Sequence, residues 1–491
     1  MNRTQRRLFM WFFIFLFALV APTVVLFAQG YRFNLENNIF IHSGSITIKS
    51  WPKDINIYID GEKQENANLN VINGSNTING VKPGKYKLTC SKPGYLDWEK
   101  EIEVHSGIST EFWNVLLFPE KNNPEIIPFD TSDKIEQIFL SPNDNDELIL
   151  FSKNDSERKI YLLNTKNSES KLLFTTEEFN FIPKEEGLNV EWNTNHKKII
   201  LPAIDSKNQK QHLIIDVDEE ETTEFTILNN FFKNENINQA RWMFNEENEI
   251  TILTDKNNLF SFDYKKETVQ LIAKNVNGFD FAEYSIYFSQ LPNNIIWKVK
   301  QTDFKNKEQI TTEPMLIEDE TLSTEITAYD EYRIFINTDE KSLLHNENNK
   351  KNLISTLKPS EKILGVQFSD DGKKLLCWNE HEVWYYMLRD WEIQPKRYFG
   401  DKITITRSSE LIKNVQWMDS YENIIVSTSN NIKTFEVDPR NHTNIANLIT
   451  TEKEIQDKNL LYNKKNQTLY YLDDNTIFSL LVVDDSGFLG F

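Results

Sequence analysis

The feature that most constrains the fold is a sequence unit that recurs along the chain after residue 130. Each unit holds a short apolar run that ends in an aromatic residue, a polar turn, a second apolar run and a third run rich in Ile, Leu and Tyr. The units follow one another at intervals of roughly 40 to 50 residues. Eight of them begin at Gln137, Asn189, Gln239, Gly278, Ile326, Gly365, Asn414 and Lys458. A unit of this size cannot bury its apolar faces alone, so it must pack against its neighbours.

Four short strands per unit at this period are typical of a β-propeller, in which each unit is one blade around a common axis. Residues 124–129 carry a strand-like run before the first unit, and the last unit lacks a fourth run. The two ends together complete one blade, which closes the ring and removes free sheet edges. Because the units at Gly278 and Ile326 are the most degenerate, we predict a propeller of seven or eight blades over residues 124–491.

The polar turn of one unit carries a family resemblance that points the same way. Its sequence, FSDDGKK at residues 368–374, resembles the corresponding turn of WD-type and TolB-like propeller blades. The sequence LSPN at residues 140–143 resembles that turn more loosely. The resemblance implies the same fold as the repeat period.

The amino-terminal segment has the composition of a membrane span. Residues 8–28 form an uncharged apolar run in which Thr23 is the one polar side chain. As a helix this run is roughly 31 Å long at 1.5 Å per residue, enough for the hydrocarbon core of a bilayer. The alternative is a cleaved signal peptide, which requires a shorter apolar run and small residues at the cleavage site. We predict a single transmembrane helix.

The charges that flank this segment predict its orientation. Arg3, Arg6 and Arg7 precede the apolar run, whereas one Arg and one Glu lie within the ten residues after it. The positive-inside rule therefore places residues 1–7 in the cytoplasm as a short stub. The rest of the chain is expected on the extracytoplasmic side of the cell membrane.

A small β module is predicted between the anchor and the propeller. Apolar residues alternate with polar ones at Ile46/Ile48, Ile55/Ile57/Ile59, Tyr86/Leu88/Cys90 and Ile102/Val104. This alternation puts the apolar side chains on one face of each strand, as in a sandwich of two sheets around one core. Asp60-Gly61 suits a tight hairpin, and the KPGK and KPGY segments suit type II turns. We predict a small β-sandwich over residues 44–118, which makes the whole chain all-β after its anchor.

The order of these residues carries a second family resemblance. The pattern PGxYxLxxxxxGYxxW at residues 83–98, together with GSITI at residues 44–48 and Asp60-Gly61, resembles the PEGA domain. The tetrad that names that family falls at residues 52–55, where only Pro52 is kept, and an Asn-rich insertion covers residues 64–79. PEGA domains are small β-sandwiches found mostly in prokaryotic cell-surface and envelope proteins. The resemblance therefore implies a location in the cell envelope.

Aromatic residues of the module are its candidate ligand site. They are Trp51, Tyr95, Trp98 and Trp113. Aromatic faces stack on the apolar faces of sugars, so these four residues form a candidate platform for a carbohydrate. The alternative is that they cap the small core beside its Pro-Gly turns.

The rest of the sequence contains no catalytic or metal-binding pattern. There is no GxSxG, HExxH, P-loop or EF-hand motif, and the seven His residues are scattered. The two cysteines, Cys90 and Cys377, are predicted to be buried thiols, and acidic pairs such as Asp370/Asp371 are predicted to be solvated turn residues. We therefore predict no cofactor, no metal site and no enzymatic activity.

Charge narrows the class of partner. The net charge of −20 excludes a general affinity for nucleic acid, because no basic patch overrides it. We predict a non-catalytic binding or scaffolding protein whose propeller engages an envelope protein or a polysaccharide. One alternative is an envelope hydrolase or lyase with carboxylates in the propeller channel. Another is a component of a secretion or assembly complex.

Overall fold

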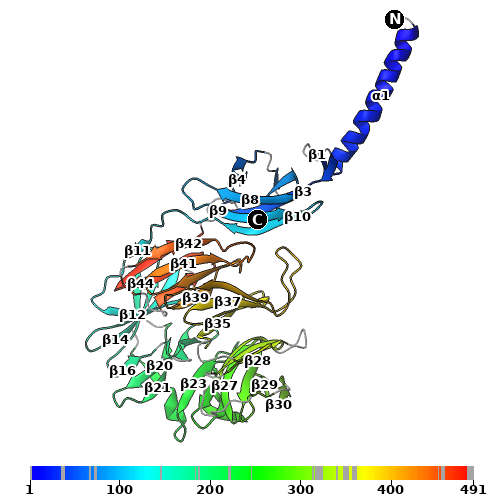
Figure 1. Ribbon diagram of the computed structural model, residues 1–491. Coiled ribbons are helices and arrows are strands. Elements are labelled where there is room, and N and C mark those ends of the chain that lie inside the picture. The colour runs from blue at the N-terminus through cyan, green and yellow to red at the C-terminus, as the bar shows by residue number, and fades with distance from the viewer. Residues whose placement is uncertain are drawn as a thin grey trace.

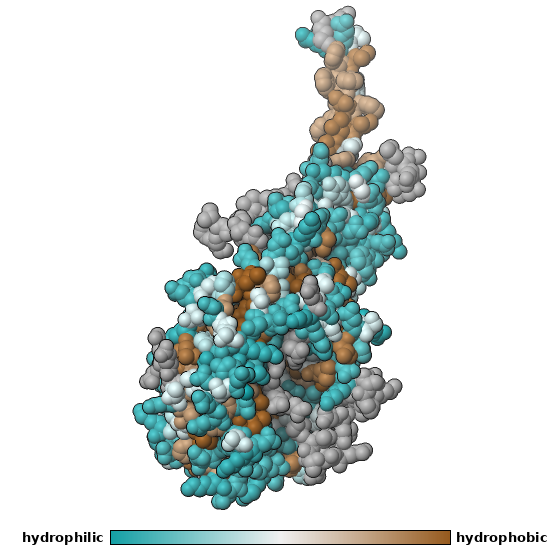
Figure 2. Space-filling view, turned by 90° about the vertical axis from the view of Figure 1, so that its left-hand side faces the viewer, coloured by the Kyte–Doolittle hydropathy of each residue, from teal (hydrophilic) through white to brown (hydrophobic). Residues whose placement is uncertain are grey.

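The computed structural model begins with one long helix, α1 (Arg3–Ala28), which stands away from the rest of the protein (Figure 1). The structure describes residues 3–34, 39–65, 68–70, 74–143, 146–182, 184–185, 188–218, 223–244, 246–311, 314–315, 324–338, 341–346, 353–356, 362–451, 453–454 and 459–483. No residue of α1 is buried, and its apolar side chains project from a mainly hydrophilic body (Figure 2). By length and composition α1 fits a membrane span and equally an amino-terminal signal sequence.

A two-stranded hairpin joins the helix to the first folded unit. Its strands are β1 (Tyr31–Asn34) and β2 (Ile39–His42). The guanidinium group of Arg32 donates to the carbonyl of Phe27 at 3.1 Å and lies 4.1 Å from the centre of the Phe27 ring. A ring nitrogen of His42 lies 2.9 Å from the carbonyl oxygen of Gln29. The end of α1 is therefore held against the hairpin by side chains as well as by the chain.

The predicted small module is a sandwich of two four-stranded sheets. The strands of the first sheet, in spatial order, are β10 (Ser109–Leu116), β3 (Gly44–Trp51), β7 (Ser75–Val81) and β6 (Asn68–Asn70). Those of the second are β5 (Glu62–Lys63), β4 (Asn56–Ile59), β8 (Gly84–Ser91) and β9 (Trp98–Val104). The alternating residues predicted to face the core do so, with Ile46, Ile48 and Leu88 fully buried. Strands β9 and β10 lie at sheet edges, and this places them where another domain can cover them.

The turns of the sandwich agree with the sequence in two places and differ in one. Asp60 and Gly61 both have positive φ, as a tight hairpin between β4 and β5 requires, and Gly94 of the KPGY segment also has positive φ. Gly84 of the KPGK segment is not among the glycines with positive φ. It begins strand β8 and pairs with Val104, so sheet pairing replaces the predicted type II turn.

The remaining strands form blades, eight of them within the described residues, which confirms the propeller and selects the larger of the two predicted blade numbers. Blades 1 and 2 contain β12 (Lys134–Leu140), β13 (Glu147–Lys153), β14 (Arg158–Asn164) and β15 (Ser170–Thr176), then β16 (Phe179–Phe181), β19 (Glu191–Trp192), β20 (Lys198–Asp205), β21 (Lys210–Asp216) and β22 (Phe225–Ile227). Blades 3 and 4 contain β23 (Ile237–Trp242), β24 (Glu249–Thr254), β25 (Asn258–Asp263) and β26 (Thr268–Lys274), then β27 (Val276–Ala282), β28 (Ser285–Gln290), β29 (Ile295–Lys300) and β30 (Asp303–Gln309).

The second half of the propeller continues the same order. Blades 5 and 6 contain β31 (Glu325–Asp330), β32 (Arg333–Asn337), β33 (Lys341–Asn346) and β34 (Leu353–Thr356), then β35 (Gly365–Phe368), β36 (Lys374–Trp378), β37 (Glu382–Met387) and β38 (Lys402–Arg407). Blades 7 and 8 contain β39 (Asn414–Trp417), β40 (Asn423–Ser427), β41 (Asn431–Glu436) and β42 (Ile445–Thr450), then β43 (Leu460–Asn463), β44 (Thr468–Asp473), β45 (Thr476–Leu481) and β11 (Glu125–Ile127). Three short elements lie outside this order. Strands β17 (Lys184–Glu185) and β18 (Leu188–Asn189) pair with each other, and η1 (Leu228–Phe231) is a 3-10 helix.

Blade 8 closes the ring with strands from both ends of the propeller sequence. Strand β11 pairs antiparallel with β45, and Ile127 lies opposite Ile477. Both side chains are buried in a core that also contains Ile138 of blade 1. The predicted completion of one blade by the two ends is therefore confirmed. Closure leaves the eight blades without a free edge between the first and the last.

Apolar clusters between successive blades hold the ring together. Trp242 and Trp417 end the first strands of blades 3 and 7 and are buried in these clusters. In blade 6, Phe368 holds the equivalent place at the end of β35, and Trp378 lies on the next strand, β36. The two cysteines, Cys90 and Cys377, are both free and fully buried, as predicted.

Candidate binding face

One face of the propeller carries both the contacts to the sandwich and several exposed aromatic residues. In a four-stranded antiparallel meander the first and third turns lie at the same end of the strands. We call the propeller face that carries these turns the first-turn face. The sandwich contacts it at the third turns of blades 6 and 7, residues 388–401 and 437–444.

Amide side chains of the propeller cap the edge strands of the sandwich. The backbone N–H of Glu99 on β9 donates to Asn444 Oδ1 at 3.2 Å, and Asn444 Nδ2 donates to the Glu99 carbonyl at 3.2 Å. Gln394 does the same for β10, since it accepts from the Glu111 N–H at 3.1 Å and donates to the Ser109 carbonyl at 2.7 Å. Each amide takes the place of a neighbouring strand. Two of the four edge strands of the sandwich, β9 and β10, are thereby partly paired by the propeller.

A buried ion pair lies beside these amides. Lys100 on β9 is fully buried, and its ammonium group lies 3.0 Å from a carboxylate oxygen of Glu436 on β41. The same ammonium group donates to the carbonyls of Asp438, Arg440 and His442 in the third turn of blade 7. Burial raises the pKa of the Glu436 carboxyl, and Lys100 offsets only part of that effect.

A second ion pair lies within the propeller, next to its contact with the sandwich. Both guanidinium nitrogens Nη1 and Nη2 of Arg397 donate to the carboxylate of Glu422, at 2.8 and 2.7 Å. Lys374 contacts the same carboxylate. Burial favours the neutral acid, but Lys374 and Arg397 outweigh it, so the pKa of Glu422 lies below its usual value.

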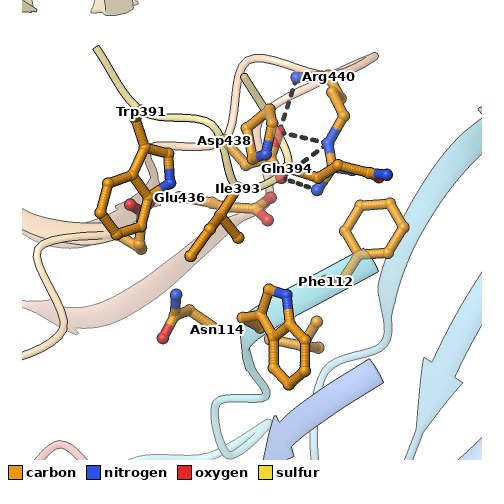
Figure 3. Close-up of a pocket in the computed structure, with 12 residues that line it drawn as sticks. Phe112, Asn114, Trp391, Ile393, Gln394, Glu436, Asp438 and Arg440 are labelled. Carbon is orange, nitrogen blue, oxygen red and sulfur yellow. Dashed lines mark hydrogen bonds and ion pairs between the residues drawn. The ribbon is translucent and has the colours of Figure 1, made fainter. Parts of the chain in front are cut away.

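A cavity of about 170 Å³ opens at the seam between sandwich and propeller. Its residues come from strand β10 on one side and from blades 6 and 7 on the other, mainly from their third turns (Figure 3). Glu422 of the first turn of blade 7 and Glu436 at the end of β41 complete the lining. Half-buried indole rings line it from both domains, Trp113 from the sandwich and Trp391 from the propeller. Three carboxylates also line it, from Glu422, Glu436 and Asp438.

Away from the seam, exposed aromatic residues continue the first-turn face over three successive blades. Phe244, Tyr284 and Tyr332 lie in the first turns of blades 3, 4 and 5 and are 53%, 65% and 40% exposed. The rings of Phe244 and Tyr284 contact each other edge to face, with centroids 5.9 Å apart. We call these three residues the aromatic arc. Exposed aromatic residues of this kind are common at interaction surfaces.

The sandwich matches a known domain family. Residues 43–116 match the PEGA domain family. The sandwich is a PEGA domain. Its two edge strands β9 and β10 are the elements that dock on the propeller, so the PEGA domain forms the link between α1 and the ring of blades.

The propeller is similar in fold to several solved structures. These are the beta-propeller domain of Cps50 (Swd1) from Myceliophteria thermophila (10% identity, 73% of this chain and 100% of that chain, TM-score 0.42), Sqt1 from Saccharomyces cerevisiae (11% identity, 74% and 100%, TM-score 0.46) and Hsv2 from Kluyveromyces lactis (12% identity, 64% and 98%, TM-score 0.40). At such identities the likeness concerns the fold alone. No curated protein matches the sequence.

The four aromatic residues predicted as a ligand platform occupy different places in the PEGA domain. Trp98 is buried, and its indole nitrogen donates to Glu436 at 3.2 Å. Tyr95 packs against the core, and Trp51 is half-buried at the end of β3. Among the described residues that line the seam cavity, Trp113 is the one member of the predicted set. The platform stays a prediction, and the structure does not bring its four members into one cavity.

Charged side chains on the first strands of neighbouring blades contact one another. Arg241 on β23 lies 3.2 Å from Glu191 on β19 and 2.5 Å from Asp280 on β27. Asp280 also accepts the backbone N–H of Ala328 on β31 at 2.7 Å. Burial raises the pKa of Glu191, although Arg241 acts against it. These contacts join four successive blades.

The same position in other blades carries glutamine. Gln367 accepts the backbone N–H of Trp417 at 3.1 Å, and Gln416 accepts that of Tyr462 at 3.0 Å. In each case the residue just before the aromatic end of a first strand bonds to the next blade. Glu191 and Asp280 are carboxylates on first strands, and both form contacts between neighbouring blades.

Apart from Trp98 and Trp113, sequence reasoning did not find the residues of the seam, and it found none of the aromatic arc. One signal was available for Lys100, because it occupies an inward position in the alternation of Trp98, Ile102 and Val104. A Lys at such a position is buried only with a partner. No comparable signal exists for Gln394 or Asn444, whose role depends on where the PEGA domain docks.

Proposed function

We propose that this protein is a membrane-tethered, non-catalytic binding platform of a prokaryotic cell envelope. In this proposal residues 1–7 are cytoplasmic, residues 8–28 span the membrane, and the PEGA domain (residues 44–118) and propeller (residues 124–491) lie on the extracytoplasmic side. The three arginines before α1 support that orientation, and the PEGA domain supports an envelope location. The propeller engages another protein.

The observation that carries the proposal is the aromatic arc. Phe244, Tyr284 and Tyr332 are exposed on consecutive blades of the face that also holds the PEGA domain. Tyr and Phe are residues that dominate the energetics of protein interfaces, because a large rigid ring loses little conformational entropy on binding. Many other large aromatics of the blades are buried in the apolar clusters between them, whereas nothing in the fold requires these three to be on the surface.

Charge next to the arc indicates the chemistry of the partner. Glu246, Glu247 and Glu283 are exposed beside it, and none of them forms an ion pair among the described residues. The chain as a whole carries a net charge of −20. A partner with a basic patch would gain from both the carboxylates and the electron-rich ring faces. We therefore propose a basic protein surface as the occupant of the arc.

The experiment uses the full chain in lipid nanodiscs. Partners are recovered from solubilised envelope membranes with the wild type and with the triple variant Phe244→Ala, Tyr284→Ala, Tyr332→Ala. The matched control is Val269→Ala with Leu271→Ala, two residues that are exposed on the outer strand β26 of blade 3. We expect one stoichiometric partner that the control retains and the triple variant loses at least tenfold, with weaker binding at high salt. Equal recovery by the triple variant would contradict the proposal.

The sequence also predicted a polysaccharide as a possible partner and an envelope hydrolase or lyase as an alternative function. Each of these gives a different result in the same assay. A polysaccharide partner would be retained by the arc as glycan without a stoichiometric protein. An envelope hydrolase or lyase would require Glu191 and Asp280 to act on a substrate. The bonds of both carboxylates to Arg241 favour their role as blade ties.

A further inference from the structure

We propose that the cavity at the seam between the PEGA domain and the propeller binds one neutral sugar ring. This site is distinct from the aromatic arc and does not depend on the proposed protein partner. Three properties of the cavity lead to this ligand: aromatic walls from both domains, carboxylates that are each already paired with a cation, and a small size.

The aromatic walls are held in place from both sides. The backbone N–H of Trp391 donates to the Arg397 carbonyl at 2.8 Å, and that of Arg397 donates back at 3.1 Å, so the turn that carries Trp391 is a closed loop. The ammonium group of Lys373 lies 4.2 Å from the centre of the Trp391 ring. The indole nitrogen of Trp113 donates to Glu111 at 2.9 Å. The electron-rich faces of such rings attract the C–H groups of a sugar.

Every carboxylate of the lining already contacts a cation. Glu422 is paired with Arg397 and Lys374, Glu436 with Lys100, and Asp438 with Arg440 at 2.6 Å. An ionic ligand would therefore lose its hydration without gaining a counter-charge. Glu422 Oε2 and Glu436 Oε1 each accept one hydrogen bond among the described residues, so each has a lone pair for another, whereas Arg440 occupies both oxygens of Asp438. Hydroxyl groups are the neutral donors that use these lone pairs.

The polar side chain best placed for a ligand is that of Asn114. It lines the cavity from β10, is exposed, and makes no hydrogen bond with any described residue. Figure 3 shows it across the open space from Trp391 and Ile393. Its amide offers both a donor and an acceptor, as neighbouring hydroxyls of a sugar require.

The size of the cavity limits the ligand. Pockets for drug-sized molecules have volumes of about 300–1,000 Å³. A cavity of about 170 Å³ admits a single six-membered ring, and a longer glycan would extend from it into solvent. The ligand class is therefore a neutral monosaccharide or one unit of a neutral glycan.

The test is saturation-transfer NMR with the full chain in lipid nanodiscs. The probes are glucose, galactose, mannose and N-acetylglucosamine, with glucuronic acid as an anionic comparison. We expect at least one neutral sugar to bind with quenching of tryptophan fluorescence. Trp391→Ala and Trp113→Ala should each weaken that binding at least tenfold, Trp391→Phe less, and Asn114→Ala severalfold.

Two controls separate this site from the arc and from unfolding. Phe244→Ala alters the arc and should leave sugar binding unchanged, whatever its effect on a protein partner. Asn114→Ala removes an exposed side chain that makes no hydrogen bond with a described residue, so we expect it to leave stability unchanged. The proposal is overturned if none of the neutral sugars binds, if glucuronic acid binds more tightly than they do, or if Trp391→Ala and Trp113→Ala bind like the wild type.

Discussion

The ammonium group of Lys100 in the PEGA domain lies 3.0 Å from the carboxylate of Glu436 in blade 7, and both residues are buried. Three carbonyls of the adjoining turn, residues 438–442, accept from the same ammonium group. A charge in such a place is tolerated only when it is paired and hydrogen-bonded. The PEGA domain and the propeller are therefore joined by a contact that is costly to break from either side.

Replacement of Lys100 should loosen the junction. Lys100→Met leaves Glu436 buried without its cation and three carbonyls without a donor. Loss of one partner of a buried pair costs about 3–5 kcal/mol. We expect amide hydrogen exchange in residues 437–444 to speed up by about a hundredfold or more. Lys87→Met is the control, because the Lys87–Glu99 pair is exposed and worth about 0–1 kcal/mol. Unchanged exchange in Lys100→Met would show that the junction does not depend on the pair.

Two buried carboxyls at the seam should respond to pH in opposite directions. Lys374 and Arg397 lower the pKa of Glu422 in the folded state, so its contribution to stability is complete above about pH 4.5 and is lost as the pH falls further. Burial raises the pKa of Glu436, so its charged form costs stability, and that cost disappears as the pH falls through the raised pKa. Thermal unfolding between about pH 7 and pH 3 measures both effects. Relative to the wild type, Glu422→Gln should flatten the acid loss of stability, and Glu436→Gln should steepen it. The same pH profile for both variants would contradict the assignment.

The charged side chains of Arg241, Glu191 and Asp280 should stabilise the folded state only when all three are present. Arg241→Met leaves Glu191 and Asp280 facing one another without a cation and should lower the free energy of unfolding by about 3–5 kcal/mol. Adding Glu191→Gln and Asp280→Asn to that variant removes the repulsion and should restore most of the loss. Denaturant unfolding gives both values. A triple variant less stable than Arg241→Met alone would show that the carboxylates stabilise the ring by another route.

Ring closure offers a test with two neighbouring residues. Ile127 on β11 is 4% exposed and packs in the core of blade 8, whereas Ile126 is 61% exposed on the same strand. Ile127→Ala should cost about 2–5 kcal/mol through the lost packing and the cavity it leaves. Ile126→Ala should change stability by less than about 0.5 kcal/mol. The midpoint of urea unfolding distinguishes them, and equal midpoints would mean that β11 does not support the ring.

Much of the fold could be predicted because its signals are local. The alternation of Ile46 and Ile48 sets the core face of β3, and Asp60-Gly61 sets its own hairpin, since both depend on backbone geometry within a few residues. The repeat period predicts blades because each blade packs mainly on its neighbours in sequence. The closure by β11 could also be predicted, because an extra strand precedes the first repeat unit and the last unit lacks its fourth strand.

The candidate sites depend instead on contacts between distant parts of the chain. Trp113 and Trp391 meet at one cavity because β10 docks on the third turn of blade 6, and no periodicity in the sequence encodes that docking. The same holds for Asn444 and the edge of β9. Periodic patterns specify which face of a strand is buried, so they predicted the sandwich and the blades. Which surfaces of two finished domains meet is set by the complementarity of side chains that come together only after both have folded.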